Sequence, residues 1–302
     1  MTAPAGEALN ATVVQRPLAA DLLSLTKPRI ISLLLVTTVM PMYAAGSPDF
    51  LTVLAVVVGG YLMAGGANAV NMYFDRDIDH VMARTRTRPI PSGRMAPQAV
   101  MAFGIASATA ATFLLGRFVN VASAALALGG FYCYVFVYTR WLKRSTPQNI
   151  VLGGAAGAFP PLVGWAAVTG TVDLRAIVLF LIVFYWTPPH FWALALNKQQ
   201  DYGRAGVPMA PNAWGTRETI DQMLWYSVLL VALTLLPVTI GMFGLVYFAS
   251  AAVLGGIFLH GAWRVWRQRD SGEWSAPSWK LYKFSLLYLA LLFAAMAVDR
   301  HL

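Results

Sequence analysis

Residues 71–94 read NMYFDRDIDHVMARTRTRPIPSGR and place three aspartates and five arginines directly behind an apolar run that ends near Phe74. Asn71, Asp75 and Asp79 are spaced i, i+4 and i+8, so they share one face if the helix continues that far, whereas Asp77 points away. Oxygen ligands on a common face are what Mg²⁺ prefers. Eight residues of helix rise about 12 Å, so either two ions bind or the helix unwinds before Asp79.

The rest of the chain is very apolar: 58% of its 302 residues are hydrophobic, 12% are charged, and the mean hydropathy is +0.60. A spanning helix needs roughly 20 apolar residues, which predicts an all-α integral membrane protein. Sustained period-2 alternation is missing from the apolar runs, which disfavours a membrane barrel, and the single Cys133 excludes an intramolecular disulfide framework. We expect about nine transmembrane helices, near residues 30–45, 51–74, 98–116, 121–139, 149–169, 174–197, 220–242, 246–266 and 281–298.

The basic residues predict the orientation of these spans. Of the 22 Lys and Arg residues, only Arg117, Arg175 and Arg300 fall on the side opposite the N-terminus. Because loops retained in the cytoplasm carry the excess of positive charge, we expect a cytoplasmic N-terminus, an external C-terminus and a location in the inner (cytoplasmic) membrane. The net charge of +9 matches anionic lipid headgroups, and no nucleic-acid partner is expected.

The chain divides into a short tail and one membrane domain. Residues 1–25 lack the basic and apolar regions of a signal peptide, so we expect a retained cytoplasmic tail, in which residues 18–25 could form an interfacial helix. Residues 26–302 form the transmembrane domain.

A second charged loop, 198–219, follows the sixth span on the same side as loop 75–97. It begins with Asn197-Lys198-Gln199-Gln200-Asp201, which repeats the Asn-x-x-x-Asp spacing of Asn71 and Asp75. Carboxylates, Mg²⁺ and cationic donors together suit a diphosphate. The alternative is a solvated membrane-flanking face, since the positive-inside rule alone is enough to explain the arginines of loop 75–97.

These motifs carry a family resemblance. The pattern from Asn71 to Arg94 resembles the first signature of the UbiA superfamily of intramembrane prenyltransferases. Within it, TKPR at 26–29, WTPPHFWALAL at 186–196 and DYGRAGVPMAP at 201–211 resemble the branch that farnesylates heme. Many superfamily members have repeated aspartates in the second motif, whereas here Asp201 stands with Asn197, Lys198 and Tyr202, which disfavours the quinone branch.

The resemblance implies a UbiA-type bundle that transfers the farnesyl group of farnesyl diphosphate to a vinyl group of protoheme IX (heme B), with addition of water, giving heme O and diphosphate. Mg²⁺ would be the cofactor, and the downstream heme-modifying enzyme is a candidate partner. The implied catalytic and metal residues are Asn71, Asp75, Asp79 and Asp201. The implied substrate-binding residues are Lys27, Arg29, Arg84, Arg88, Arg94, His190, Asn197, Lys198, Tyr202 and Arg204.

His190 is the histidine of greatest interest, because an intramembrane ionisable residue suggests function. It follows Pro188-Pro189, which we expect to break or bend the sixth helix, and it either contacts heme or packs between helices through a hydrogen bond. We expect His80 to be an exposed neighbour of Asp79.

Two other functions remain open at this stage. One is a prenyltransferase acting on an aromatic quinone precursor, and the other is a membrane transporter, although transporter sites tend to lie at the midplane.

Overall fold

The structure is a computed structural model that describes residues 17–302, and it is built from helices, with no strand in that range. Within residues 17–302 it contains nine helices long and apolar enough to cross a membrane, which confirms the predicted spans and makes this a multi-pass membrane protein. Of the tail predicted for residues 1–25, residues 1–16 lie outside the described residues. The spans are α2 (Pro28–Ala45), α3 (Phe50–Phe74), α5 (Pro97–Phe118), α6 (Val121–Tyr132) with its continuation to Ser145, α8 (Asn149–Thr169), α9 (Leu174–Leu196), α12 (Thr216–Thr239), α13 (Leu245–Arg267) and α14 (Ser275–Arg300).

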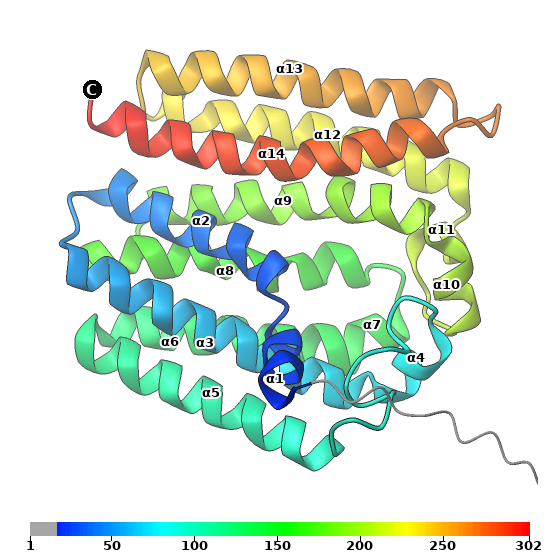
Figure 1. The fold of residues 1–302 in the computed structure, drawn as a ribbon. Helices are drawn as coiled ribbons and strands as arrows, with labels where there is room; N and C mark the ends of the chain where they lie inside the picture. Colours follow the sequence, from blue (N-terminus) through cyan, green and yellow to red (C-terminus); the bar gives the residue numbers. More distant parts are fainter. Residues whose placement is uncertain (1–16) are drawn as a thin grey trace, which may run out of the picture.

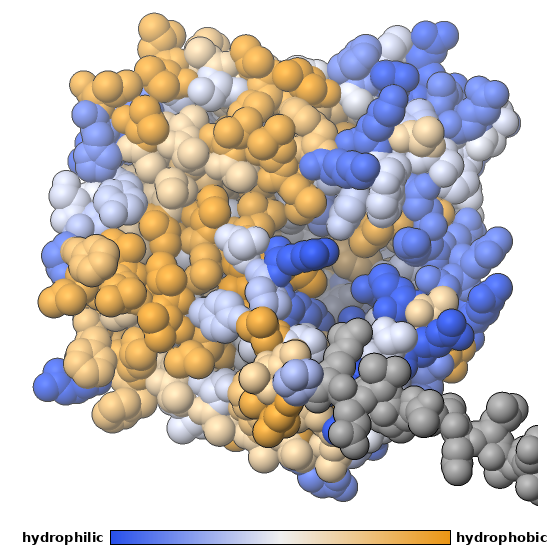
Figure 2. Space-filling model, in the orientation of Figure 1, coloured by the Kyte–Doolittle hydropathy of each residue, from blue (hydrophilic) through white to orange (hydrophobic). Residues whose placement is uncertain are grey.

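The long helices run side by side as one bundle, with α3, α5 and α6 on one flank and α12, α13 and α14 on the other (Figure 1). Between the flanks lie α2, α8 and α9, and the loops of one end carry the short helices α4 (Arg76–Val81), α10 (Gln199–Arg204) and α11 (Ala210–Ala213). We call this the loop end. Apolar side chains cover most of the face shown in Figure 2, whereas hydrophilic ones gather at the loop end. This division is expected of a bundle whose middle faces hydrocarbon.

A short helix, α1 (Leu18–Thr26), precedes the first span, so the helix predicted from residues 18–25 is present. Its C-terminus is tied to α3, because Asn68 Nδ2 donates to the Thr26 carbonyl (2.9 Å) and the Thr26 and Tyr61 hydroxyls lie 2.8 Å apart. Lys27 then takes a left-handed conformation (φ 56°, ψ 63°) between α1 and α2. Such a conformation costs of order 1 kcal/mol or more for a side-chain-bearing residue, so the surrounding contacts must hold it.

The fourth span changes its winding partway along. After Tyr132 the chain forms a π-helix, η1 (Cys133–Leu142), and returns to α-helix at α7 (Lys143–Ser145). The Thr139 hydroxyl donates to the Tyr134 carbonyl five residues back (2.8 Å). π-Helical segments are rare and are frequently found at functional sites.

Of the break or bend expected in α9 at Pro188 and Pro189, the break is wrong, because the helix continues through both residues to Leu196. A bend stays a prediction. Both prolines are buried, and α9 packs against α8, α12 and α14. Tight packing by neighbouring helices is what allows proline in a membrane span. The Thr187 hydroxyl also bonds the Val183 carbonyl (2.9 Å) in this turn.

Candidate active site

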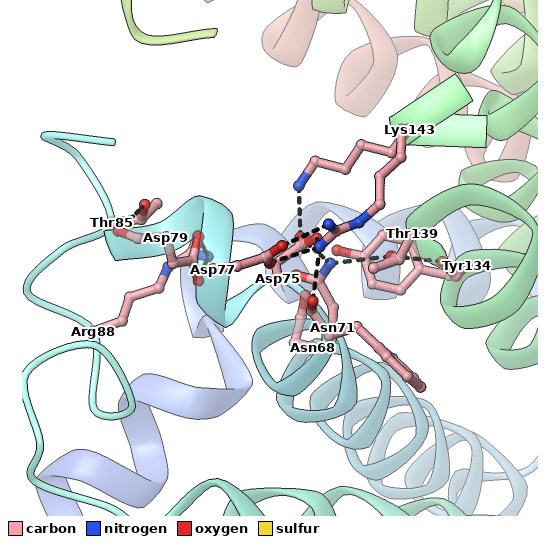
Figure 3. Close-up of polar contacts among 12 residues, drawn as sticks. Asn68, Asn71, Asp75, Asp77, Asp79, Thr85, Arg88, Tyr134, Thr139 and Lys143 are labelled. Carbon is pink, nitrogen blue, oxygen red and sulfur yellow. Dashed lines mark hydrogen bonds and ion pairs between the residues drawn. The ribbon is translucent and has the colours of Figure 1, made fainter. Parts of the chain in front are cut away.

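A buried polar cluster closes the loop end of α3 (Figure 3). Asn71 Nδ2 donates to Asp75 Oδ2 (2.7 Å) and to the Thr139 hydroxyl (3.0 Å), and Lys143 Nζ pairs with the same Asp75 oxygen at 2.6 Å. We call Asn71, Asp75, Thr139 and Lys143 the α3 cluster. It joins the end of α3 to the π-helical segment, which brings Thr139 and Lys143 to the same helix end.

Asp75 also has a spare acceptor. Its Oδ1 is buried without a hydrogen-bond partner, and Arg144 Nη2 lies 3.7 Å from it. Because a buried carboxylate oxygen is costly to leave unpaired, this atom is suited to receive a cation. Among residues 17–302, however, no three His, Cys, Asp or Glu side chains come close enough to hold a metal by themselves, so an ion here needs the Asn71 amide oxygen or substrate oxygens as well.

The helix does not run regularly from Asn71 to Asp79. The structure ends α3 at Phe74, makes Asp75 its cap and resumes as α4 at Arg76, so the geometry is nearer to the predicted interruption than to a straight helix. Asp79 is buried and pairs with Arg88 through both carboxylate oxygens (2.8 and 2.7 Å). Asp77 is exposed and points away from the face of Asn71 and Asp75, as predicted. It pairs with Arg144, and the hydrogen bond from Arg144 lowers the Asp77 pKa to about 2.

Lys27 reaches into the α3 cluster from the turn between α1 and α2. Its Nζ donates to Asn68 Oδ1 (3.1 Å) and Asn71 Oδ1 (3.2 Å). Burial, followed by the nearby charge of Arg88, lowers the pKa of this ammonium to about 7. A diphosphate would supply the negative charge that this site lacks.

The remaining arginines predicted for diphosphate binding have different surroundings. Arg94 pairs with the buried Asp21 of α1 (Nε to Oδ1, 3.0 Å) and donates to the Thr87 carbonyl (3.0 Å), so it fastens the loop to α1. Arg84 and Arg29 are exposed and make no ion pair with any described residue. Arg84 and Arg29 are therefore better placed than Arg94 to meet a ligand, and the substrate-binding role of all these arginines stays a prediction.

The second motif is arranged differently from the first. Asn197 bonds α14, donating to Ser278 Oγ (2.6 Å) and accepting from Ser275 Oγ (2.7 Å), so it does not touch Asp201 as Asn71 touches Asp75. Asp201 and Lys198 are half-buried, and Arg204 is exposed.

Tyr202 is a buried residue of this second loop. Burial raises the pKa of its phenol, while the charges of Arg84 and Arg88 act in the opposite direction. Both motifs lie at the loop end (Figure 1), although the structure shows no direct contact between Asp201 and the α3 cluster.

His190 lies on α9 beside α14. Its Nδ1 is 2.6 Å from the Ser285 hydroxyl, and its ring stacks between Trp186 (4.1 Å between centroids) and Tyr282 (5.0 Å). This geometry matches the packing alternative, and a contact with heme stays a prediction. His80 is exposed, as expected.

An apolar cavity of about 280 Å³ runs between α2, α3, α6, α8 and α9. Asn68 and Tyr134 line it, and Asn68 also bonds Lys27, so the cavity meets the polar site near these residues. Several glycines of α8, Gly153, Gly154 and Gly157, form part of its wall. This arrangement suits a ligand with a long apolar chain and an anionic head.

Sequence reasoning missed Lys143, Thr139 and Asn68 as members of this site. The positive-inside rule alone explains a lysine at position 143, so nothing in the sequence singles it out as a site residue. No local pattern connects Thr139 or Lys143 with Asp75, 64 or more residues earlier in the chain, because the contact depends on how two spans pack.

The UbiA prenyltransferase family model matches residues 32–289 of the chain. Protoheme IX farnesyltransferase of Roseiflexus sp. (strain RS-1) is 55% identical over 285 residues, covering 94% of this chain and 53% of the relative. The protein of the same name from Granulibacter bethesdensis is 48% identical over 288 residues, covering 93% and 91%. This chain spans about half the length of several of the curated relatives it matches. Among solved structures, a UbiA homolog from Archaeoglobus fulgidus bound to DMAPP and Mg²⁺ shares the fold, with a TM-score of 0.65, 15% identity and coverage of 92% and 99%.

Proposed function

Because this chain belongs to the UbiA prenyltransferase family, we propose that it transfers a farnesyl group from farnesyl diphosphate to a vinyl group of heme B, with addition of water, giving heme O and diphosphate. The names of the Roseiflexus and Granulibacter relatives support heme as the acceptor. The observation that carries the proposal is an apolar cavity meeting a buried cluster of polar and cationic side chains.

The donor would bind with its apolar chain in the cavity and its diphosphate at the α3 cluster. Lys143 belongs to this cluster, and Lys27 contacts it from the turn between α1 and α2. Arg88 is paired with the neighbouring Asp79. These cations would bind diphosphate oxygens and stabilise the charge that grows on them as the bond to C1 breaks. Arg29, Arg84, Lys198 and Arg204 are proposed as outer contacts of the same headgroup.

The proposed Mg²⁺ ligands are Asn71, Asp75, Asp79 and Asp201. The unpaired Asp75 Oδ1 and the oxygen-only donor set fit a hard cation. A homolog of the same fold was solved with DMAPP and Mg²⁺, which supports a divalent metal. When bound, Mg²⁺ would supply positive charge for the departing diphosphate.

The remaining steps follow from the surroundings of C1. The π electrons of the heme vinyl group would form the new bond to C1 while the C1–O electron pair leaves with diphosphate. The cation left beside the porphyrin would then take up water and lose a proton. The apolar wall of the cavity would keep water from C1 while its bond to the diphosphate oxygen breaks.

We further propose that the loop end faces the cytoplasm in the inner membrane, as the distribution of Lys and Arg predicts. The enzyme that next modifies heme O would then receive its substrate from the same membrane.

The test is an incubation of the purified protein in lipid with farnesyl diphosphate, Mg²⁺ and heme B, followed by mass spectrometry of the extracted hemes. We expect a heme heavier by a farnesyl group plus water. Asp75→Asn should abolish this product, and Asp77→Asn, which changes an exposed neighbour, should leave most of it. An unmodified heme pool from folded protein would contradict the proposal.

Two further arms address the other functions. Prenylation of 4-hydroxybenzoate in place of heme would indicate a quinone-type enzyme. Uptake of a solute into vesicles without release of diphosphate would indicate a transporter.

A further inference from the structure

A second cleft lies at the loop end, separate from the apolar cavity. It has a volume of about 410 Å³ and is lined by residues of α3, α4 and η1 and by Arg144, namely Tyr73, Phe74, Arg76, Asp77, Arg140 and Arg144. We call it the arginine cleft. None of its residues lines the apolar cavity, so the proposed reaction leaves it without a role.

The arginine cleft carries unbalanced positive charge. Its one carboxylate, Asp77, is already paired with Arg144 through two contacts of 2.7 and 2.8 Å. Arg76 and Arg140 are exposed and make no ion pair within residues 17–302. Their guanidinium groups instead lie over aromatic rings, Arg76 over Tyr73 (4.5 Å) and Arg140 over Phe74 (5.5 Å), and Arg76 Nη1 also donates to the Tyr73 carbonyl (2.8 Å). Stacking of this kind fixes a guanidinium while leaving its remaining N–H groups available for an anion.

The surroundings of the cleft are those of a membrane interface. Trp141, next to Arg140, is exposed, and indole rings at the end of a span favour the headgroup region. A row of aromatic rings, which we call the aromatic track, runs from Phe74 along the surface of the fourth span, away from the loop end. The ring centroids of Phe74 and Phe136 are 6.3 Å apart and those of Phe136 and Tyr132 are 5.1 Å apart, and both Phe136 and Tyr132 are exposed. The cationic cleft is therefore continuous with an apolar surface on the same span.

We propose that the arginine cleft binds the phosphate of an anionic phospholipid, with Arg76 and Arg140 as donors and an acyl chain lying along Phe136 and Tyr132. Two observations favour a lipid over a soluble phosphate: the cleft opens beside an exposed tryptophan, and the aromatic track gives an acyl chain a surface to cover. This binding is independent of the proposed farnesyl transfer.

The experiment measures lipid binding to the detergent-purified full chain by native mass spectrometry. Phosphatidylglycerol and phosphatidylcholine with the same acyl chains are titrated against the wild type, an Arg76→Gln/Arg140→Gln variant and a matched control, Arg264→Gln/Arg267→Gln. The control removes the same charge from exposed positions at the same end of the bundle, and Arg267 also lies over an aromatic ring, that of Trp263 (5.1 Å). Both variants are checked for an unchanged thermal transition. Arg140→Gln alone is the second variant if the double variant does not fold.

We expect the wild type to bind phosphatidylglycerol more tightly than phosphatidylcholine. Loss of charge-assisted hydrogen bonds should weaken phosphatidylglycerol binding in the cleft variant about tenfold more than in the control. Equal losses in the two variants would reduce the effect to general surface charge and overturn the proposal. Displacement of the lipid by glycerol 3-phosphate at similar concentration would show a soluble-anion site and would also overturn it.

Discussion

Replacing Lys143 with Met tests the ion pair at the centre of the α3 cluster. The pair is well shielded, with side-chain exposures of 12% for Lys143 and 1% for Asp75. Met keeps much of the apolar stem of Lys143 but leaves Asn71 as the only side chain that donates a hydrogen bond to the buried Asp75 carboxylate. Removing one partner of a buried pair typically costs about 3–5 kcal/mol, and we expect about 3 kcal/mol here because Arg144 lies close enough to compensate in part.

The free energy of unfolding would be measured by SDS titration in bicelles without Mg²⁺ for the wild type, Lys143→Met, Asp75→Asn and the double variant. The double variant should recover much of the loss, giving a coupling of about 2 kcal/mol. Asp77→Asn is the control, because its pair with Arg144 is exposed and should contribute less than about 1 kcal/mol. Additive effects of the two substitutions would refute the idea that Lys143 neutralises Asp75.

Three further predictions concern the cavity, the loop and the metal. Gly157 lines the cavity with no atom within 4 Å of an added Cβ, so Gly157→Leu should fold normally. The variant should lower kcat/KM for farnesyl diphosphate about tenfold or more and leave kcat/KM for geranyl diphosphate unchanged. Equal effects on both donors would argue against the cavity as the prenyl site. Arg94→Gln should lower the free energy of unfolding by about 3 kcal/mol, because it leaves the buried Asp21 without its cationic partner. Arg84→Gln should raise KM for the donor and leave stability unchanged. Thermal melts and initial rates distinguish the two effects, and the reverse pattern would exchange the assigned roles. Chelation with EDTA should abolish product formation, and added Mg²⁺ should restore it; full activity in excess chelator would exclude a required metal.

The spans could be predicted from the sequence because hydropathy over some 20 residues reports the solvent, and the solvent is uniform along each span. The errors in the predicted spans lie at the ends of the helices. The last span was predicted from residue 281, but α14 begins at Ser275, and the seventh was predicted from residue 220, but α12 begins at Thr216. The first turns of these helices are polar and lie at the loop end, where hydropathy no longer marks helix. The break predicted at Pro188 and Pro189 failed for another reason. Packing of α9 against α8, α12 and α14 offsets the local cost of proline, and the sequence does not show that packing.

The candidate site was predictable where its members are close in sequence. Asn71 and Asp75 touch because they are one turn apart on a helix, and no further information is needed. Their matching pair, Asn197 and Asp201, has the same spacing but does not touch, because serines of α14 bind Asn197 instead. Lys143 and Thr139 reach Asp75 and Asn71 only through the packing of the fourth span against α3. Spacing thus predicted the contact between Asn71 and Asp75, while their cationic partners needed the structure.

The π-helical segment has a consequence for how this span tolerates change in length. A π turn holds an additional residue compared with an α turn, so η1 behaves as an insertion accommodated within the helix. Deleting one residue between Cys133 and Thr139 would let the span relax to an ordinary α-helix that still crosses the membrane. Because the deleted residue is the additional one of the π turn, the residues after it would keep nearly the same direction, and Lys143 and Arg144 would still face Asp75 and Asp77. The span would therefore tolerate this deletion better than a deletion in its α-helical part, which would turn those two side chains by about 100° around the helix axis.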